Sequence, residues 1–257
     1  MLEFIKQIAV EAGKIIKKAY DTRIEKIEHK GDIDLVTEID LKSEQLLKQR
    51  IQEKYPVDAI LAEEGKEVNA GATRRWIIDP LDGTTNFTHR FPFLAVSIGV
   101  EEAGKMKYGV VYNPVMKEMF WTQCGNGAFL NGKPISVSAT NRLSQALVGT
   151  GFPYDRWQHG DFYIKEYQIF MQNTQGVRRG GAAAVDLCYV GCGRLDGFFE
   201  RKLHPWDMAA GSLILKEAGG KLSQFSGEKW HYTNDTIVAS NTNLHQAMLK
   251  LLAKANL

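Results

Sequence analysis

The sequence predicts an α+β protein in which sheets and helices are stacked in layers. Three observations support this fold class. Apolar residues recur at helical spacing in residues 1–20. Short apolar runs separated by glycine, proline and asparagine fill the middle of the chain, and helical patterns return toward its end. Because strands and helices are mixed along one chain, alternating layers are the arrangement that buries the apolar faces of both.

The individual elements follow from the spacing of apolar and polar residues. Residues 1–20 have one apolar and one charged side at the helical period, and Thr37 opens a Thr-x-x-Asp pattern typical of a capped helix start. Bounded apolar runs predict strands at 60–62, 76–78, 94–100, 108–112, 119–121, 146–150 and 236–240. Further helices are expected at 160–173, 182–192, 207–218 and 243–254. A polar stretch at 131–144 predicts a boundary between subdomains 1–140 and 141–257.

The composition excludes several classes of protein. The 32 basic and 30 acidic side chains give a net charge of +2, so no strong field attracts a polyanion and nucleic acid is not an expected partner. No apolar stretch approaches the ~18 residues of a membrane span, and the charges among the first twenty residues are unlike a signal peptide. Three cysteines are too few for a disulfide framework. We expect a cytoplasmic protein.

The segment from Asp79 to Phe87 reads Asp-Pro-Leu-Asp-Gly-Thr-Thr-Asn-Phe and directly follows an apolar strand. Pro80 fixes its own φ angle, so Asp79 and Asp82 can converge on one point. Gly83 allows close approach of a ligand, and the amides that follow can face an anion as at a helix N-terminus. Carboxylates beside an anion site, with no histidine or cysteine nearby, favour Mg²⁺. The alternative is an ordinary turn with aspartate at turn positions.

Three other carboxylates stand at the ends of apolar runs. Glu63 follows residues 60–62, Glu200 follows residues 197–199, and Asp207 opens the helical pattern near residue 207. Each has a structural alternative: a solvated turn for Glu63, an exposed turn charge for Glu200 and a helix N-cap for Asp207. Together with Asp79 and Asp82 they suggest a shared acidic site.

Residues 79–87 and 206–211 resemble the two signature motifs of the inositol monophosphatase family. The resemblance continues through residues 34–40, 63–64 and 178–184, so it covers nearly the whole chain. It implies a layered αβαβα sandwich like that of fructose-1,6-bisphosphatases, with the N-terminal subdomain carrying most of the metal ligands. It also implies a homodimer, two or three Mg²⁺ ions, sensitivity to Li⁺ and hydrolysis of a small phosphorylated polyol.

The resemblance assigns a role to each matching residue. Glu63, Asp79 and the carbonyl of Leu81 would hold the first metal, and Asp79, Asp82 and Asp207 the second. Thr84 and Asp40 would take a proton from the attacking water, so that the implied catalytic residues are Thr84, Asp40, Glu63 and Asp79. Asp40 has an alternative role in the helix cap that begins at Thr37. The implied substrate contacts are Asp82, Gly83, Thr84, Gly181, Ala182, Ala183, Glu200 and Asp207.

Two other phosphatase patterns are excluded by their surroundings. Asp32-Ile33-Asp34 matches the aspartyl-phosphate motif of haloacid dehalogenase-type enzymes, but the residues before it are polar, whereas that motif needs a buried strand. Cys188 and Arg194 match the loop of cysteine-dependent phosphatases. Cys188 lies within an apolar helical pattern, so we expect a buried, unreactive thiol.

The sequence therefore predicts a Mg²⁺-dependent inositol-1-phosphate phosphatase. Fructose-1,6-bisphosphatase, histidinol phosphatase and nucleotidase activities of the same fold remain alternatives for the substrate. Related nucleotidases typically have Thr-Lys-Glu where this chain has Thr84-Thr85-Asn86, which favours the inositol ester. An alternative of a different class is an RNA- or transcription-associated factor with secondary catalysis.

Overall fold

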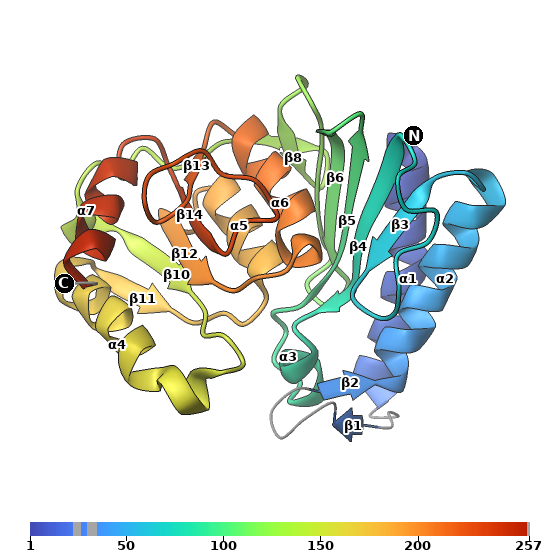
Figure 1. The fold of residues 1–257 in the computed structure, drawn as a ribbon, viewed down its shortest axis with the longest axis horizontal. Helices are drawn as coiled ribbons and strands as arrows, with labels where there is room; N and C mark the ends of the chain where they lie inside the picture. Colours follow the sequence, from blue (N-terminus) through green and yellow to red (C-terminus); the bar gives the residue numbers. More distant parts are fainter. Residues whose placement is uncertain (23–26, 30–34, 256–257) are drawn as a thin grey trace.

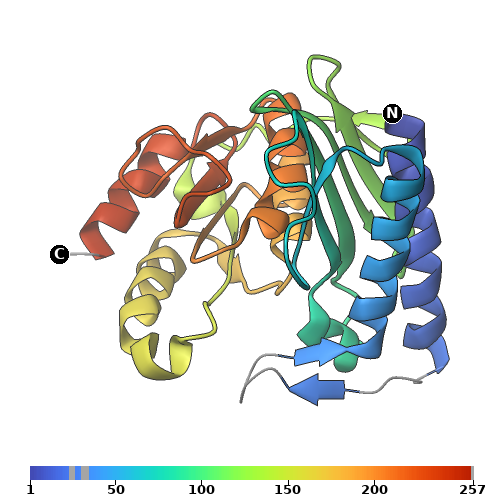
Figure 2. The ribbon, with the colours of Figure 1, turned by 45° about the vertical axis from the view of Figure 1, so that its right-hand side comes forward.

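The structure is a computed structural model that describes residues 1–22, 27–29 and 35–255, with only the backbone described for 27–29 and 35–37. It consists of five layers (Figures 1 and 2). Two N-terminal helices cover the outer face of a seven-stranded sheet, a pair of helices lies between this sheet and a five-stranded sheet, and two more helices cover the far side. The expected αβαβα sandwich is confirmed.

The seven-stranded sheet lies in the N-terminal half, by which we mean the described residues up to 140. Its strands follow sequence order, and all neighbours are antiparallel except the parallel first pair. The strands are β3 (Ala59–Ala62), β4 (Arg74–Asp82), β5 (Ala95–Glu102), β6 (Lys105–Asn113), β7 (Glu118–Gln123), β8 (Ala128–Leu130) and β9 (Lys133–Ile135).

The five-stranded sheet lies in the C-terminal half, from residue 141 onward, and has the order β11-β10-β12-β14-β13. Strand β10 runs parallel to both of its neighbours, while β14 runs antiparallel to β12 and β13. The strands are β10 (Leu147–Thr150), β11 (Gly176–Arg178), β12 (Gly197–Arg201), β13 (Lys221–Ser223) and β14 (Thr236–Ser240).

Helix packing joins the layers. Of the outer helices, α1 (Leu2–Thr22) buries an apolar stripe at the predicted spacing, whereas the buried face of α2 (Glu38–Lys54) mixes apolar and polar residues. Between the sheets lie α5 (Ala183–Gly191) and α6 (Pro205–Glu217), and α6 packs against the inner face of the first sheet. A Cβ atom at Gly109 would approach the Ala210 carbonyl oxygen to 2.8 Å, so glycine on β6 permits this close contact. The far layer is α4 (Arg156–Asn173) and α7 (His245–Ala255).

The helices and longer strands lie where the sequence predicts them. Other short elements, unlike β3, β10 and β14, were not predicted, because three to five residues carry little periodicity; they are β1 (Ile27–His29), β2 (Leu35–Thr37), α3 (Thr84–Thr88), β8, β9, β11, β12, β13 and a 3₁₀ turn at Leu143–Gln145. The Asp32-Ile33-Asp34 pattern, and with it Asp34 of the resemblance, lies outside the described residues. Within the described ranges, no helix combines the length and apolar character of a membrane span.

Candidate active site

Strand β4 carries the first two carboxylates of the site and contains an irregularity between them. Asp79 pairs with Ser97 and Asp82 with Ala95, so three steps on β4 match two on β5. In a regular strand, residues three apart point to opposite faces, whereas a bulge brings them to the same face. Pro80 stands in this bulge, where no ladder donor is needed. The strand thus continues through Asp82, rather than turning after residue 78 as the sequence suggested.

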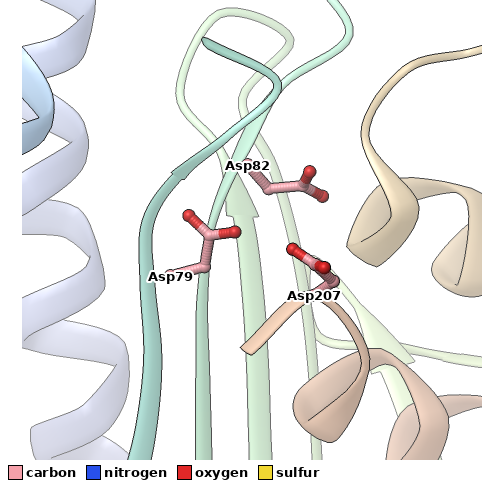
Figure 3. A group of neighbouring side chains, drawn as sticks. All are labelled: Asp79, Asp82 and Asp207. Carbon is pink, nitrogen blue, oxygen red and sulfur yellow. The ribbon is translucent and has the colours of Figure 1, made fainter. Parts of the chain in front are cut away.

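Three aspartates from distant parts of the chain meet at this bulge. Side-chain oxygens of Asp79, Asp82 and Asp207 all lie within 4.8 Å of one another, and Figure 3 shows the three carboxylates facing a common space. Asp79 is 1% and Asp82 7% exposed, while Asp207 is half-buried. Such close carboxylates repel one another unless protons or a cation lie between them.

Burial raises the pKa values of these groups, and for Asp79 and Asp82 repulsion adds to its effect. Burial, followed by the charges of Glu63, Asp82 and Asp207, raises the pKa of Asp79 well above its ordinary value. Burial and the charge of Asp207 raise the pKa of Asp82 to about 8, and burial raises that of Asp207 to about 6. A divalent cation among these oxygens would favour the ionised forms. The donor set therefore fits a hard metal ion.

Asp82 also ties the two halves of the molecule together. Its Oδ2 accepts a hydrogen bond of 2.8 Å from the backbone N–H of Ala184, in the first turn of α5. The residue at the N-cap of this helix is Ala182, which has no side-chain acceptor. Asp82 therefore caps α5 from another element, and the helix N-terminus partly offsets the effect of burial on its charge.

Asp207 is held within its own helix. Its Oδ2 accepts the backbone N–H of His204 at 2.7 Å, in a capping box at the start of α6. The N-cap is His204 and Asp207 is the third helical residue, so the interpretation of Asp207 as an N-cap is wrong. The reason is that Pro205 occupies the first helical position, where its missing N–H costs nothing.

Thr84 and Asp40 lie in contact beside the aspartate cluster. The Thr84 hydroxyl donates to Asp40 Oδ1 at 2.9 Å and lies 3.3 Å from the carbonyl oxygen of Leu81. Asp40 is 1% exposed although it stands in the first turn of α2. The polar side chain of Ser43, one turn further along, donates to the carbonyl oxygen of Pro80 at 2.9 Å. Helix α2 thus fixes both the Thr84 hydroxyl and the bulge.

The turn after β4 is shaped by Gly83 and Asn86. Gly83 has a φ of 93°, in the left-handed region that glycine tolerates, and it precedes the short helix α3. The Asn86 amide donates to the carbonyl oxygens of Phe93 at 2.6 Å and Gly180 at 2.9 Å. It therefore fastens this turn to the segment that leads into α5.

One cavity of about 220 Å³, lined by residues of both halves, contains the aspartate cluster. All the residues that the resemblance implied are in its wall except Asp40, which lies behind Thr84; the wall includes Glu63, Asp79, Leu81, Asp82, Gly83, Thr84, Gly181, Ala182, Ala183, Glu200 and Asp207. Glu200 is half-buried rather than on an exposed turn. Within the described residues, no donor forms a hydrogen bond with its carboxylate, and burial raises its pKa to about 8.

Other residues near the cavity escaped sequence reasoning. Arg156 and Lys202 stand in its wall and add positive charge, beside Arg179, which lies in the resembling segment 178–184. Asp186 is 2% exposed on α5, and burial followed by the charge of Glu200 raises its pKa well above the ordinary value. The sequence offered one sign of Asp186, namely that it is a single acidic residue in an otherwise apolar helical segment. The prediction for Cys188 is confirmed, because the residue is fully buried and burial raises the pKa of its thiol.

The comparisons with known proteins agree with this arrangement. The family model "Inositol monophosphatase family" matches residues 1–257. The chain belongs to the inositol monophosphatase family. An inositol monophosphatase from Dictyostelium discoideum is 41% identical, over 95% of this chain and 92% of the relative. A protein named Nus factor SuhB from Pseudomonas aeruginosa is 40% identical, over 97% and 94% of the two chains.

A solved structure shares the fold as well. The extragenic suppressor protein suhB from Bartonella henselae superposes with a TM-score of 0.93 at 37% identity, over 98% of each chain. Membership of the inositol monophosphatase family confirms the sequence-based prediction of a phosphatase. The acidic cluster that the sequence predicted is also present, and it comes from β4 and the first turn of α6.

Proposed function

We propose that this cavity hydrolyses phosphate monoesters with Mg²⁺ and that inositol 1-phosphate is its substrate. The observation that carries the proposal is the convergence of Asp79, Asp82 and Asp207 within 4.8 Å, beside the hydrogen-bonded Thr84 hydroxyl. The names of relatives such as the Dictyostelium inositol monophosphatase support the choice of substrate.

The proposed metal ligands are all oxygen atoms, which suits Mg²⁺. Glu63, Asp79 and the carbonyl of Leu81 would hold one ion, and Asp79, Asp82 and Asp207 a second, with a third weaker ion near Glu63. When bound, such ions activate water and neutralise charge on the phosphate. Because side-chain oxygens of Asp79 and Asp207 lie within 4.8 Å of one another, a cation between them would relieve their repulsion.

The chain itself would position the water and the phosphate. Asp40, fixed in α2, accepts from the Thr84 hydroxyl, so this hydroxyl can accept a proton from a water molecule and pass its own to Asp40. We assign the phosphate to the backbone amides of Gly83 and Thr84, at the turn held by Asn86. The catalytic set is then Thr84, Asp40, Glu63 and Asp79.

The opposite wall would bind the alcohol part of the substrate. Gly181, Ala182 and Ala183 bring backbone into the cavity, and Glu200 offers a carboxylate that no described residue engages. A carboxyl group can hydrogen-bond two neighbouring hydroxyls, because it accepts from both when ionised and donates to one and accepts from the other when protonated. Asp82 and Asp207 would add contacts from the metal side. A small phosphorylated polyol fits these groups.

The test is phosphate release from inositol 1-phosphate, fructose 1,6-bisphosphate and 3′-phosphoadenosine 5′-phosphate, each with Mg²⁺ and with excess EDTA. A preference for the inositol ester that EDTA abolishes supports the proposal. Dominance of another ester retains the metal site and changes the substrate. Activity that survives EDTA contradicts the metal mechanism.

A second candidate function comes from the relatives named Nus factor SuhB, which are 40–41% identical to this chain. An RNA- or transcription-associated role would then accompany catalysis. The net charge of +2 provides little general attraction to nucleic acid, so we assign phosphatase activity as the main function. Retention of the protein on RNA at physiological salt, without any phosphatase activity, would favour the alternative.

We also propose a homodimer. Large apolar side chains are exposed along one region, with Tyr154 53%, Trp157 70%, Ile164 49% and Met171 54% exposed. The last three recur every seven residues, which places them close to one helical face apart from the irregularity at His159. Apolar surface of this kind is typical of interfaces. Size-exclusion chromatography with light scattering tests it, and a monomer at micromolar concentration would contradict it.

The remaining expectations are proposals of the same kind. The three cysteines are unpaired, which supports a reducing cytoplasmic location. Subdomains of residues 1–140 and 141–257 are supported by the positions of the two sheets, which end at Ile135 and begin at Leu147. Inhibition by Li⁺ in competition with Mg²⁺ is measurable in the phosphate-release assay.

A further inference from the structure

We propose that Gly151 determines specificity in this cavity, because its bare α-carbon leaves the space that the Glu200 carboxylate occupies. This lets Glu200 bind the hydroxyls of a polyol phosphate. The inference rests on the proposed function, since it names the part of the same cavity that would distinguish polyol phosphates from other phosphate monoesters.

Sheet register places Gly151 and Glu200 side by side. Strands β10 and β12 are parallel, with Gly149 opposite Phe198 and Thr150 opposite Phe199. The next residue along each chain is Gly151 on one side and Glu200 on the other. The Thr150 hydroxyl donates to the carbonyl oxygen of Phe199 at 2.8 Å, which fixes the two strands at this point.

The space between the two residues has no room for a side chain at 151. A Cβ atom on Gly151 would lie 2.1 Å from Glu200 Oε1 and 2.3 Å from its Cδ, far inside the usual contact distance. Gly151 is not among the residues with positive φ, so backbone conformation does not require glycine here. Glycine is required because the Glu200 carboxylate occupies the space where a side chain at position 151 would lie.

The surroundings leave this carboxylate available to a ligand. Both Gly151 and Glu200 stand in the cavity wall. No donor among the described residues forms a hydrogen bond with Glu200, while Arg179 favours its charge and Asp82 and Asp207 oppose it. A half-buried carboxylate without donors gains most from substrate hydroxyls. A methyl group at 151 would displace the flexible end of Glu200 and leave the backbone in place.

The experiment compares Gly151→Ala, Glu200→Ala and the double variant with the unchanged protein, using inositol 1-phosphate and p-nitrophenyl phosphate with Mg²⁺. Gly160→Ala is the matched control, since a Cβ there meets no atom within 4 Å. We expect Gly151→Ala to raise KM for inositol 1-phosphate about tenfold, the usual effect of losing a hydrogen bond to a charged group. Hydrolysis of p-nitrophenyl phosphate should change by less than about twofold, because that ester has no hydroxyls to bind.

The double variant separates this effect from general damage. If the methyl group acts through Glu200, adding Gly151→Ala to Glu200→Ala causes no further loss. Gly151→Ala should also lower the melting temperature, and adding Glu200→Ala should restore it, because the clash between the methyl group at 151 and the Glu200 carboxylate is then removed. An unchanged KM, an equal loss on both esters or additive losses would overturn the proposal. If the unchanged protein hydrolyses p-nitrophenyl phosphate but not the inositol ester, the substrate assignment fails with it; if neither ester is cleaved, the proposed function itself fails.

Discussion

The two halves of the molecule contribute carboxylates of different character to one cavity. Asp79 and Asp82 in the N-terminal half are 1% and 7% exposed. Each accepts a backbone N–H, from Leu81 at 2.9 Å and Ala184 at 2.8 Å respectively. In the C-terminal half, Asp207 and Glu200 are half-buried, and no described donor engages Glu200.

This difference separates two tasks. Buried oxygens fixed by backbone donors form a preorganised site for charge, which suits metal ions and chemistry. A carboxylate with free lone pairs at the opposite wall suits recognition of a variable ligand. The N-terminal half, joined by Asp207, whose Oδ2 also accepts a backbone N–H, would therefore control the rate of the chemical step, and Glu200 the choice of substrate.

The variant with the largest expected effect on catalysis is Asp82→Asn, which tests the role of the buried carboxylates in the chemical step. Loss of one negative metal ligand should lower kcat by about 10³-fold or more, since metal stabilisation of the transition state is worth several kcal/mol. Asparagine keeps an oxygen for the Ala184 N–H, so the fold should persist. Phosphate release and far-ultraviolet circular dichroism measure the two effects.

Asp196→Asn is a matched control for Asp82→Asn. Asp196 is also 7% exposed and also accepts a backbone N–H, from Leu147 at 2.7 Å, but it lies outside the cavity wall. It should retain kcat within about threefold even if stability falls. Near-normal turnover by Asp82→Asn would remove the metal assignment.

The next largest effect is expected from Thr84→Ala. Its hydroxyl is the group that Asp40 fixes, and general base catalysis of this kind contributes about 10²–10⁴-fold. Thr84→Ser keeps the hydroxyl and should stay close to the unchanged rate. Thr88→Ala on the same short helix serves as control, because among the described residues its hydroxyl bonds only to the carbonyl oxygen of Thr85. Equal rates for Thr84→Ala and Thr88→Ala would contradict the role of Thr84.

In the C-terminal half, Glu200→Gln should affect substrate choice rather than rate. The amide has the same size but accepts fewer hydrogen bonds than a carboxylate. We expect KM for inositol 1-phosphate to rise about tenfold with kcat nearly unchanged. The ratio of kcat/KM for inositol 1-phosphate and phenyl phosphate is the measurement. An equal loss on both esters would assign Glu200 to the chemistry and break the comparison between the halves.

The sequence was sufficient for the layers and for the identities of the clustered acids. Helices and longer strands repeat their apolar pattern often enough to be recognised. The motif around Asp79 and Asp82 was visible, but the bulge that turns both side chains to one face was not, because it depends on pairing with β5. The role of Asp82 as the cap of α5 joins residues 102 positions apart, which no local pattern reveals.

Glu200 shows the same limit of prediction from sequence alone. Its position after an apolar run left an exposed turn charge as an alternative. The register of β10 with β12 decides the question, because it places Glu200 against Gly151 inside the cavity. Asp186 gained its significance only through tertiary contacts of the same kind.

The smallest effect we predict is on the melting temperature, which should depend on pH when the metal is removed. Carboxyl groups of both halves contribute to it. The pKa values of Asp82 and Glu200 are raised to about 8 in the folded protein, above their ordinary values near 4 in the unfolded chain. The folded state therefore holds extra protons between these pH values. Their stabilising contribution is present below about pH 4 and is lost as pH rises through 8. Metal-free protein should melt several degrees lower at pH 8.5 than at pH 7.

Added Mg²⁺ should reduce this pH dependence, because a cation supplies the positive charge that the protons provided. Thermal unfolding at both pH values, with Mg²⁺ and with EDTA, measures it. The range from pH 7 to 8.5 excludes any effect of His245, whose side chain lies between those of Ser223 and Ser240. Burial lowers the pKa of His245 to about 4. That group costs stability only as pH falls below about 6.5. Asp82→Asn should reduce the pH dependence of the EDTA-treated protein, and an unchanged dependence would show that the carboxylates do not cause it.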